Sequence, residues 1–129
     1  MTSSLKYFIC LLLFTCIILS ACMNEYERQA TGYYEVDKFE ALDSTSAIDL
    51  PTLVLNEDKT FVLSFKNKKI TGKWKADDYR DFTVADFTFD NRHAQGELLG
   101  QHLERMEIIN PLDFYINAKS FSFKRVEKH

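Results

Sequence analysis

The sequence predicts an all-β domain over residues 32–129, built as a small antiparallel meander barrel or a barrel-like sandwich of about eight short strands. Hydrophobic and polar residues alternate in several short segments, which is the period of a half-buried strand. Short links rich in turn-forming residues separate these segments, as in consecutive hairpins. A content of 27% charged and 14% aromatic residues is typical of a folded domain and not of a disordered chain.

The first half of this domain shows the alternation most clearly. Phe61, Leu63 and Phe65 share one face of their segment, and Ile70, Gly72 and Trp74 share one face of the next. Each segment has polar residues on its other face, so we expect one buried and one solvated side. The strands expected here are residues 32–39, 52–55, 60–65 and 70–75, joined by links at 56–59 and 66–69.

The second half contains a change of phase. Phe82 and Val84 alternate in one register, and Phe87 and Phe89 alternate in the other. We therefore expect a bulge near residues 85–86, or a break into two short strands at that point. Two further strands are expected at residues 112–116 and 120–126.

Residues 97–106 allow two interpretations. Leu99, Leu103 and Met106 fit the spacing of a helix, whereas Gly100 in the interior and the alternation of Met106 with Ile108 favour strands. We expect two strands around a turn at residues 100–101, with a helix as the alternative.

The N-terminal residues 1–21 have the pattern of an export signal. Lys6 is the one charged side chain, and the apolar run over residues 7–19 is shorter than the roughly 20 residues that a membrane-spanning helix needs. An uncleaved membrane helix is the alternative interpretation. We expect residues 1–21 to be a signal peptide and the remaining chain to form one domain of ordinary size.

The residues that end this segment, Leu19-Ser20-Ala21-Cys22, resemble the lipobox of bacterial lipoproteins. The resemblance implies that Cys22 carries a diacylglyceryl group, that cleavage occurs before it, and that the protein is anchored to a membrane of the bacterial cell envelope. Two or more acyl chains give stable attachment. Because Cys10 and Cys16 leave with the signal peptide, we expect neither thiol catalysis nor thiolate metal sites in the mature domain.

Residues 22–31 are expected to be the lipidated cysteine and a short polar tether. The residue after Cys22 is Met23 and not the aspartate associated with inner-membrane retention, which favours the outer membrane where the cell has one. The tether is short, so we expect the domain to lie close to its membrane.

Within the domain, the Gly32-led first strand, the hairpin over residues 53–61, the segment 72–75 and the final segment 121–125 resemble small lipocalin-like bacterial lipoproteins. The resemblance covers nearly the whole mature chain, although Gly32 is followed by Tyr33-Tyr34 where the larger lipocalins have Gly-x-Trp. It implies a barrel that binds a ligand inside, and a late basic residue, here Arg125, stacked on the first-strand aromatic Tyr34.

The inward aromatic residues have two possible roles. An eight-strand barrel is just wide enough for its own side chains to fill it or for one small ligand. These residues therefore either line a ligand cavity or form the core, and the short chain favours the core. They are Tyr34, Phe61, Phe65, Trp74, Phe121 and Phe123, with Arg125 beside them.

Motifs of common enzymes are missing from the sequence: there is no nucleophile elbow, phosphate loop, dinucleotide fingerprint or zinc-protease motif. His93, His102 and His129 are too sparse to predict a metal site, even if His102 and Glu104 share a strand face near His93. Asp77, Asp78 and Asp81 fit Asp-rich turns better than a catalytic acid pair or a calcium loop. We expect no catalytic residue, metal or cofactor. A formal net charge of −3 gives no basis for nucleic-acid binding.

Charge is distributed unevenly along the central strands. Five lysines between residues 66 and 75 are followed by five aspartates between residues 77 and 90. Solubility and protection of a hairpin edge explain the lysines better than a docking patch for lipid headgroups or an acidic partner. We expect a non-enzymatic lipoprotein that binds a small apolar ligand or an envelope protein. The alternatives are an interaction, inhibitor or immunity-type subunit with a filled barrel and, third, an envelope hydrolase.

Overall fold

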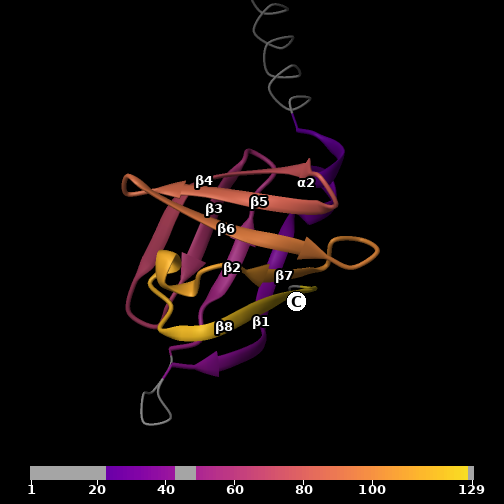
Figure 1. Cartoon of the computed structure of the whole chain (residues 1–129). Helices are drawn as coiled ribbons and strands as arrows, with labels where there is room; N and C mark the ends of the chain where they lie inside the picture. The colour runs from indigo at the N-terminus through magenta and orange to yellow at the C-terminus, as the bar shows by residue number, and fades with distance from the viewer. Residues whose placement is uncertain (1–22, 43–48, 128–129) are drawn as a thin grey trace, which may run out of the picture.

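The computed structural model describes residues 23–42 and 49–127 (Figure 1). The expected signal peptide at residues 1–21 and the expected lipidation site Cys22 lie outside the described residues. Among the described residues, no helix has both the length and the apolar character needed to cross a membrane.

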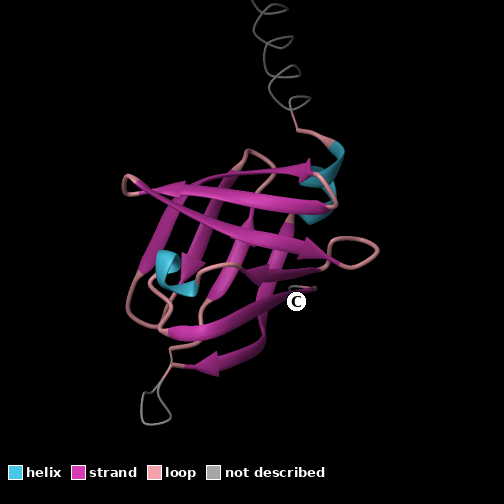
Figure 2. Ribbon diagram, in the orientation of Figure 1, coloured by secondary structure: helices cyan, strands magenta, loops and turns pink. Residues whose placement is uncertain are grey.

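Eight antiparallel strands form one closed barrel, in which each strand pairs with the next in sequence and β1 pairs with β8 (Figure 2). The expected fold class, an all-β meander barrel, is therefore confirmed. The β3–β4 hairpin is paired on both sides, β3 with β2 and β4 with β5, so the lysines near its turn have no strand edge to protect. The strands are β1 (Gly32–Ala41), β2 (Thr52–Leu55), β3 (Thr60–Ser64), β4 (Lys69–Tyr79), β5 (Phe82–Phe89), β6 (Arg92–Leu99), β7 (Arg105–Ile108) and β8 (Ala118–Val126).

Local residues fix the turn between β2 and β3. Lys59 has a positive φ of 68°, and the backbone N–H of Thr60 donates to the Asp58 carboxylate over 3.0 Å. The hydroxyl of Thr60 also donates to this carboxylate and, as the leading cause, lowers the pKa of Asp58. These contacts set the hairpin register, in which Leu55 faces Phe61.

Aromatic rings fill the barrel interior. The ring of Phe61 contacts that of Phe87 edge-on, with centroids 5.0 Å apart, and Phe114 lies 4.8 Å from Phe87. Phe121 and Phe123 form a second edge-on pair with centroids at 5.1 Å. Such pairs add to the hydrophobic stabilisation of a close-packed core.

The change of phase in residues 82–89 is neither a bulge nor a break into two strands, so both expected alternatives are wrong. Strand β5 pairs without interruption with β4 and β6 across this segment. Phe87 and Phe89 face the core, while Phe82 and Val84 face outward and Phe82 is 52% exposed. The mixed pattern thus arises because apolar side chains occupy both faces of one regular strand.

The alternative of a helix at residues 97–106 is excluded, since β6 and β7 pair across a turn that begins at Gly100. The expected strand at residues 112–116 is wrong. Pro111–Phe114 forms the 3-10 helix η1, which ends at Tyr115 with a left-handed φ of 62°. The proline suits the first helical position, and the turn directs Phe114 and Ile116 into the barrel.

The polar stretch expected to be a tether instead contains a helix, α2 (Glu25–Ala30), packed on the barrel (Figure 1). The side chain of Asn24 accepts a hydrogen bond from the Glu27 N–H over 2.8 Å, and the Glu27 carboxylate accepts one from the Asn24 N–H over 3.0 Å. This reciprocal capping box satisfies the first free donors of the helix.

Candidate functional site, a groove on the outer face of the barrel

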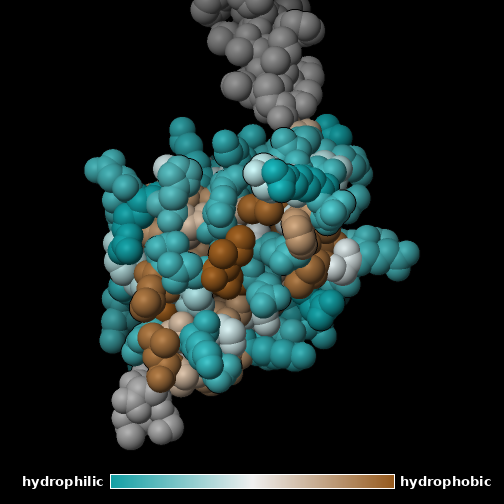
Figure 3. Space-filling view, in the orientation of Figure 1, coloured by the Kyte–Doolittle hydropathy of each residue, from teal (hydrophilic) through white to brown (hydrophobic). Residues whose placement is uncertain are grey.

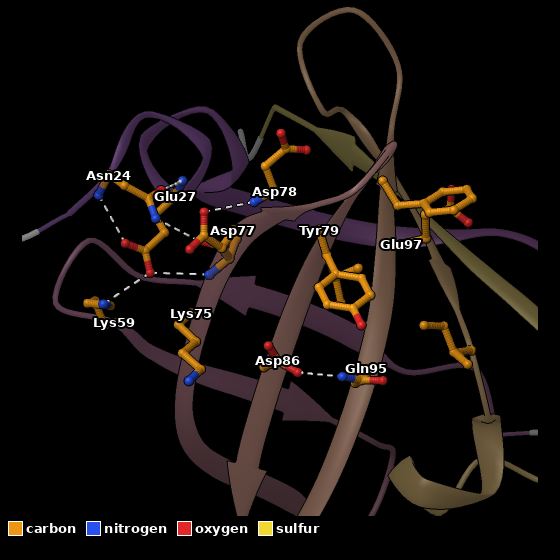
Figure 4. Close-up of a pocket in the computed structure, with 14 residues that line it drawn as sticks. Asn24, Glu27, Lys59, Lys75, Asp77, Asp78, Tyr79, Asp86, Gln95 and Glu97 are labelled. Carbon is orange, nitrogen blue, oxygen red and sulfur yellow. Dashed lines mark hydrogen bonds and ion pairs between the residues drawn. The ribbon is translucent and has the colours of Figure 1, made fainter.

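A groove of about 830 Å³ lies on the outside of the barrel, between helix α2 and the outward faces of β4, β5 and β6 (Figure 4). Helix α2 forms one wall, and Glu97 of β6 lies on the opposite side. The residues that line the groove are Asn24, Glu27, Lys59, Lys75, Ala76, Asp77, Asp78, Tyr79, Phe82, Val84, Asp86, Gln95, Glu97 and Ile109.

Strand register places the floor residues in rows. Lys75 lies opposite Asp86, which lies opposite Gln95 on the next strand. The side chain of Gln95 donates a hydrogen bond to the Asp86 carboxylate over 2.7 Å. Because alternate residues of a strand point to the same face, these polar side chains all lie outside while their neighbours pack in the core.

A second row continues the same face toward the β4–β5 turn. Val84 pairs with Asp77 on one side and with Glu97 on the other, and Phe82 pairs with Tyr79. The Asp77 carboxylate accepts a hydrogen bond from the Asp78 N–H over 2.8 Å. Two carboxylates therefore flank Val84 across three strands, and a pair of aromatic rings lies beside them on β4 and β5.

The α2 wall is fixed by one buried carboxylate. Glu27 is 1% exposed. Its Oε2 accepts a hydrogen bond from the Ala76 N–H of β4 over 3.2 Å and forms an ion pair with Lys59 Nζ at 3.1 Å. The Asn24 side-chain amide donates to the Ala76 carbonyl over 2.7 Å. Helix α2 and its N-cap are thus held on β4 by hydrogen bonds to the backbone N–H and the backbone carbonyl of Ala76.

Apolar side chains are exposed at the rim of the groove. Tyr79 is 64% exposed, Phe82 52% and Ile109 58%. Figure 3 shows hydrophobic side chains gathered between hydrophilic ones on the face that carries β4, β5 and β6. The Arg80 guanidinium lies 5.8 Å from the Tyr79 ring centroid. Clustered exposed apolar residues with a polar rim are typical of binding sites.

Negative charge predominates in the groove. Its lining contains five carboxylates and two lysines, and one carboxylate and one lysine, Glu27 and Lys59, form an ion pair with each other. Four carboxylates and Lys75 remain. A groove with this excess of acidic groups attracts cationic ligands and repels anionic ones.

Five of the aromatic residues expected to be core or ligand-lining are buried inside the barrel, each at most 2% exposed. Phe65 is half-buried at the end of β3, with Lys68 Nζ 5.0 Å from its ring centroid. None of the residues lining the groove belongs to this expected set. The five buried residues are Tyr34, Phe61, Trp74, Phe121 and Phe123.

Tyr34 and Arg125 are cross-strand neighbours on β1 and β8, as the resemblance implied, but they interact differently. The Tyr34 hydroxyl donates to the Ala30 carbonyl over 2.5 Å, and burial raises the pKa of Tyr34 to about 12 although the Arg125 charge opposes this shift. The Arg125 guanidinium donates to the carbonyls of Gln29 and His102 instead of stacking on the ring. It thereby connects α2 to the β6–β7 turn.

Sequence reasoning missed the groove. Asp77 and Asp78 line it, but Asp81 lies in the β4–β5 turn outside it, and within residues 23–42 and 49–127 no group of three or more acidic, His or Cys side chains is arranged to hold a metal ion. The sequence gives one sign of the groove: Phe82 and Val84 alternate in the opposite register to Phe87 and Phe89, which places apolar side chains on the outer face of the strand.

The chain has no match among protein-family models, curated proteins or solved structures. The barrel and the groove therefore carry the functional inference.

Proposed function

We propose that this protein is a lipid-anchored, non-enzymatic binding protein of the bacterial cell envelope, and that it engages an envelope protein through the outside of its barrel. Of the functions expected from the sequence, this is the interaction protein, in which side chains fill the barrel and the outer surface binds the partner. The lipidated residue is Cys22, and the anchor follows from the resemblance of residues 19–22 to a lipobox.

One observation carries the choice of an outer surface. The side chains that would line an internal ligand cavity are packed against one another, as in the contact between Phe61 and Phe87 and that between Phe87 and Phe114. Close packing of this kind occupies the space that a small apolar ligand needs. The exposed aromatic and acidic groove offers a binding surface instead.

Native mass spectrometry of the lipidated protein, extracted gently from its own membrane, tests this function. We expect a complex with another envelope protein and no retained small molecule. A small-molecule mass held by both the lipidated protein and a soluble form without Cys22 would contradict the proposal, and so would extraction as a bare monomer. The Cys22→Ala variant, which cannot be lipidated, is the matched control for anchoring.

A further inference from the structure

The outer groove has the chemistry of a site for a positively charged protein segment. Four carboxylates, those of Asp77, Asp78, Asp86 and Glu97, take part in no ion pair with any lysine or arginine of the described residues. Lys75 is the one cation in the groove outside the Glu27–Lys59 pair. A partner with several positive charges would supply the missing counter-charges.

The exposed aromatic rings indicate which kind of cationic group the groove would bind. A guanidinium or ammonium group on an alkyl stem packs its methylenes and its charge against an aromatic face while its donors reach a carboxylate. Asp77 and Tyr79 share the outward face of β4, and Phe82 pairs with Tyr79, so one side chain can reach a carboxylate and an aromatic ring together. The Arg80 guanidinium already lies 5.8 Å from the Tyr79 ring centroid, so a partner cation at Tyr79 would share this ring with Arg80.

The location of the groove indicates where its partner would lie. Asn24, which lines the groove, is two residues from Cys22. Two residues span at most about 7 Å, so a lipid on Cys22, as proposed above, would hold the α2 end of the groove close to the membrane. The carboxylates would repel anionic lipid headgroups, so charge complementarity favours a cationic protein segment at the membrane surface as the occupant.

We propose that the groove formed by α2, β4, β5 and β6 binds a basic segment, rich in Arg or Lys and flanked by apolar residues, of a membrane-embedded partner protein. This rests on the proposed function, for which it names the surface and the chemistry of the partner. The binding residues are Tyr79 and Phe82 for the alkyl stems and Asp77, Asp78, Asp86 and Glu97 for the charges.

Photo-crosslinking in the native membrane tests the site. The full lipidated chain would carry p-benzoylphenylalanine in place of Phe82, and a matched control chain would carry it in place of Lys124, an exposed residue of β8 on another side of the barrel. We expect crosslinks from position 82 to a protein segment with net positive charge. Combined D77N, D78N, D86N and E97Q substitutions should lower the crosslink yield at least about fivefold.

The outcomes separate this inference from the proposed function. Crosslinks from position 82 to lipid, to a second copy of the chain through its own lysine-rich hairpin, or to a neutral or acidic segment would overturn the groove proposal, as would an unchanged yield after neutralisation. Protein crosslinks from position 124 alone would overturn the groove and leave the proposed function standing. Absence of protein crosslinks at both positions would count against both. An unchanged melting temperature confirms that the neutralised chain is folded.

Discussion

Replacement of Glu27 by alanine measures how firmly α2 is held on the barrel as a wall of the groove. The Glu27 carboxylate accepts hydrogen bonds from the N–H groups of Asn24 and Ala76 and pairs with Lys59 at 3.1 Å. A hydrogen bond to a charged group contributes about 1.5–3 kcal/mol. The Lys59 side chain is 38% exposed and can be solvated by water in the variant, so loss of the ion pair contributes little to the change in the free energy of unfolding. We therefore expect Glu27→Ala to lower the free energy of unfolding by about 2–4 kcal/mol, chiefly through the orphaned Ala76 N–H.

Urea unfolding followed by the fluorescence of Trp74 is a suitable assay, because Trp74 is the one tryptophan and is 2% exposed. The expected loss corresponds to a midpoint lower by roughly 1–3 M urea. Glu25→Ala is the control on the same helix: its 3.8 Å pair with Arg28 is exposed, and its removal should change stability by less than about 0.5 kcal/mol. Equal midpoints for the Glu27 and Glu25 variants would refute the reasoning.

Three further predictions concern the barrel itself. Because burial raises the pKa of Tyr34 to about 12, the native state keeps the hydroxyl proton at pH values where the unfolded chain, with a pKa near 10, loses it. The free energy of unfolding should therefore fall by about 3 kcal/mol between pH 10 and 12, and by less in Tyr34→Phe. An equal fall of the melting temperature with pH in both proteins would contradict this. Gly72→Ala should destabilise by about 1–3 kcal/mol or more, since the new Cβ would lie 2.2 Å from the Thr88 carbonyl oxygen; an unchanged melting temperature would show that the strands separate easily. Arg125→Ala should lower stability by about 1–2 kcal/mol through loss of its link between α2 and the β6–β7 turn, and hydrogen exchange of the α2 amides should accelerate.

The period-two alternation predicted most of the barrel because it is a local property of each strand. Phe61 and Trp74 were assigned to inward faces from their neighbours alone, and both are buried. The segment at residues 112–116 was assigned wrongly for the same reason: Phe114 and Ile116 do point inward, but the 3-10 turn at Pro111 places them there and not a strand.

The groove depends on contacts between residues far apart in the sequence. A helix of six residues is not stable alone, so the polar sequence of α2 gives little sign of it; the helix forms where Asn24 and Glu27 find the backbone groups of Ala76. The outward position of Phe82 likewise becomes visible only when both neighbouring strands are in register.

The sequence by itself determined that this chain is a meander of antiparallel strands with a buried aromatic face, because strand periodicity and turn chemistry are encoded within a few residues. Only the tertiary structure decided that the barrel closes, that its aromatic residues pack against one another, and that an acidic, aromatic groove lies outside beside α2. These features depend on which distant residues meet, and on whether buried donors such as the Ala76 N–H find a partner.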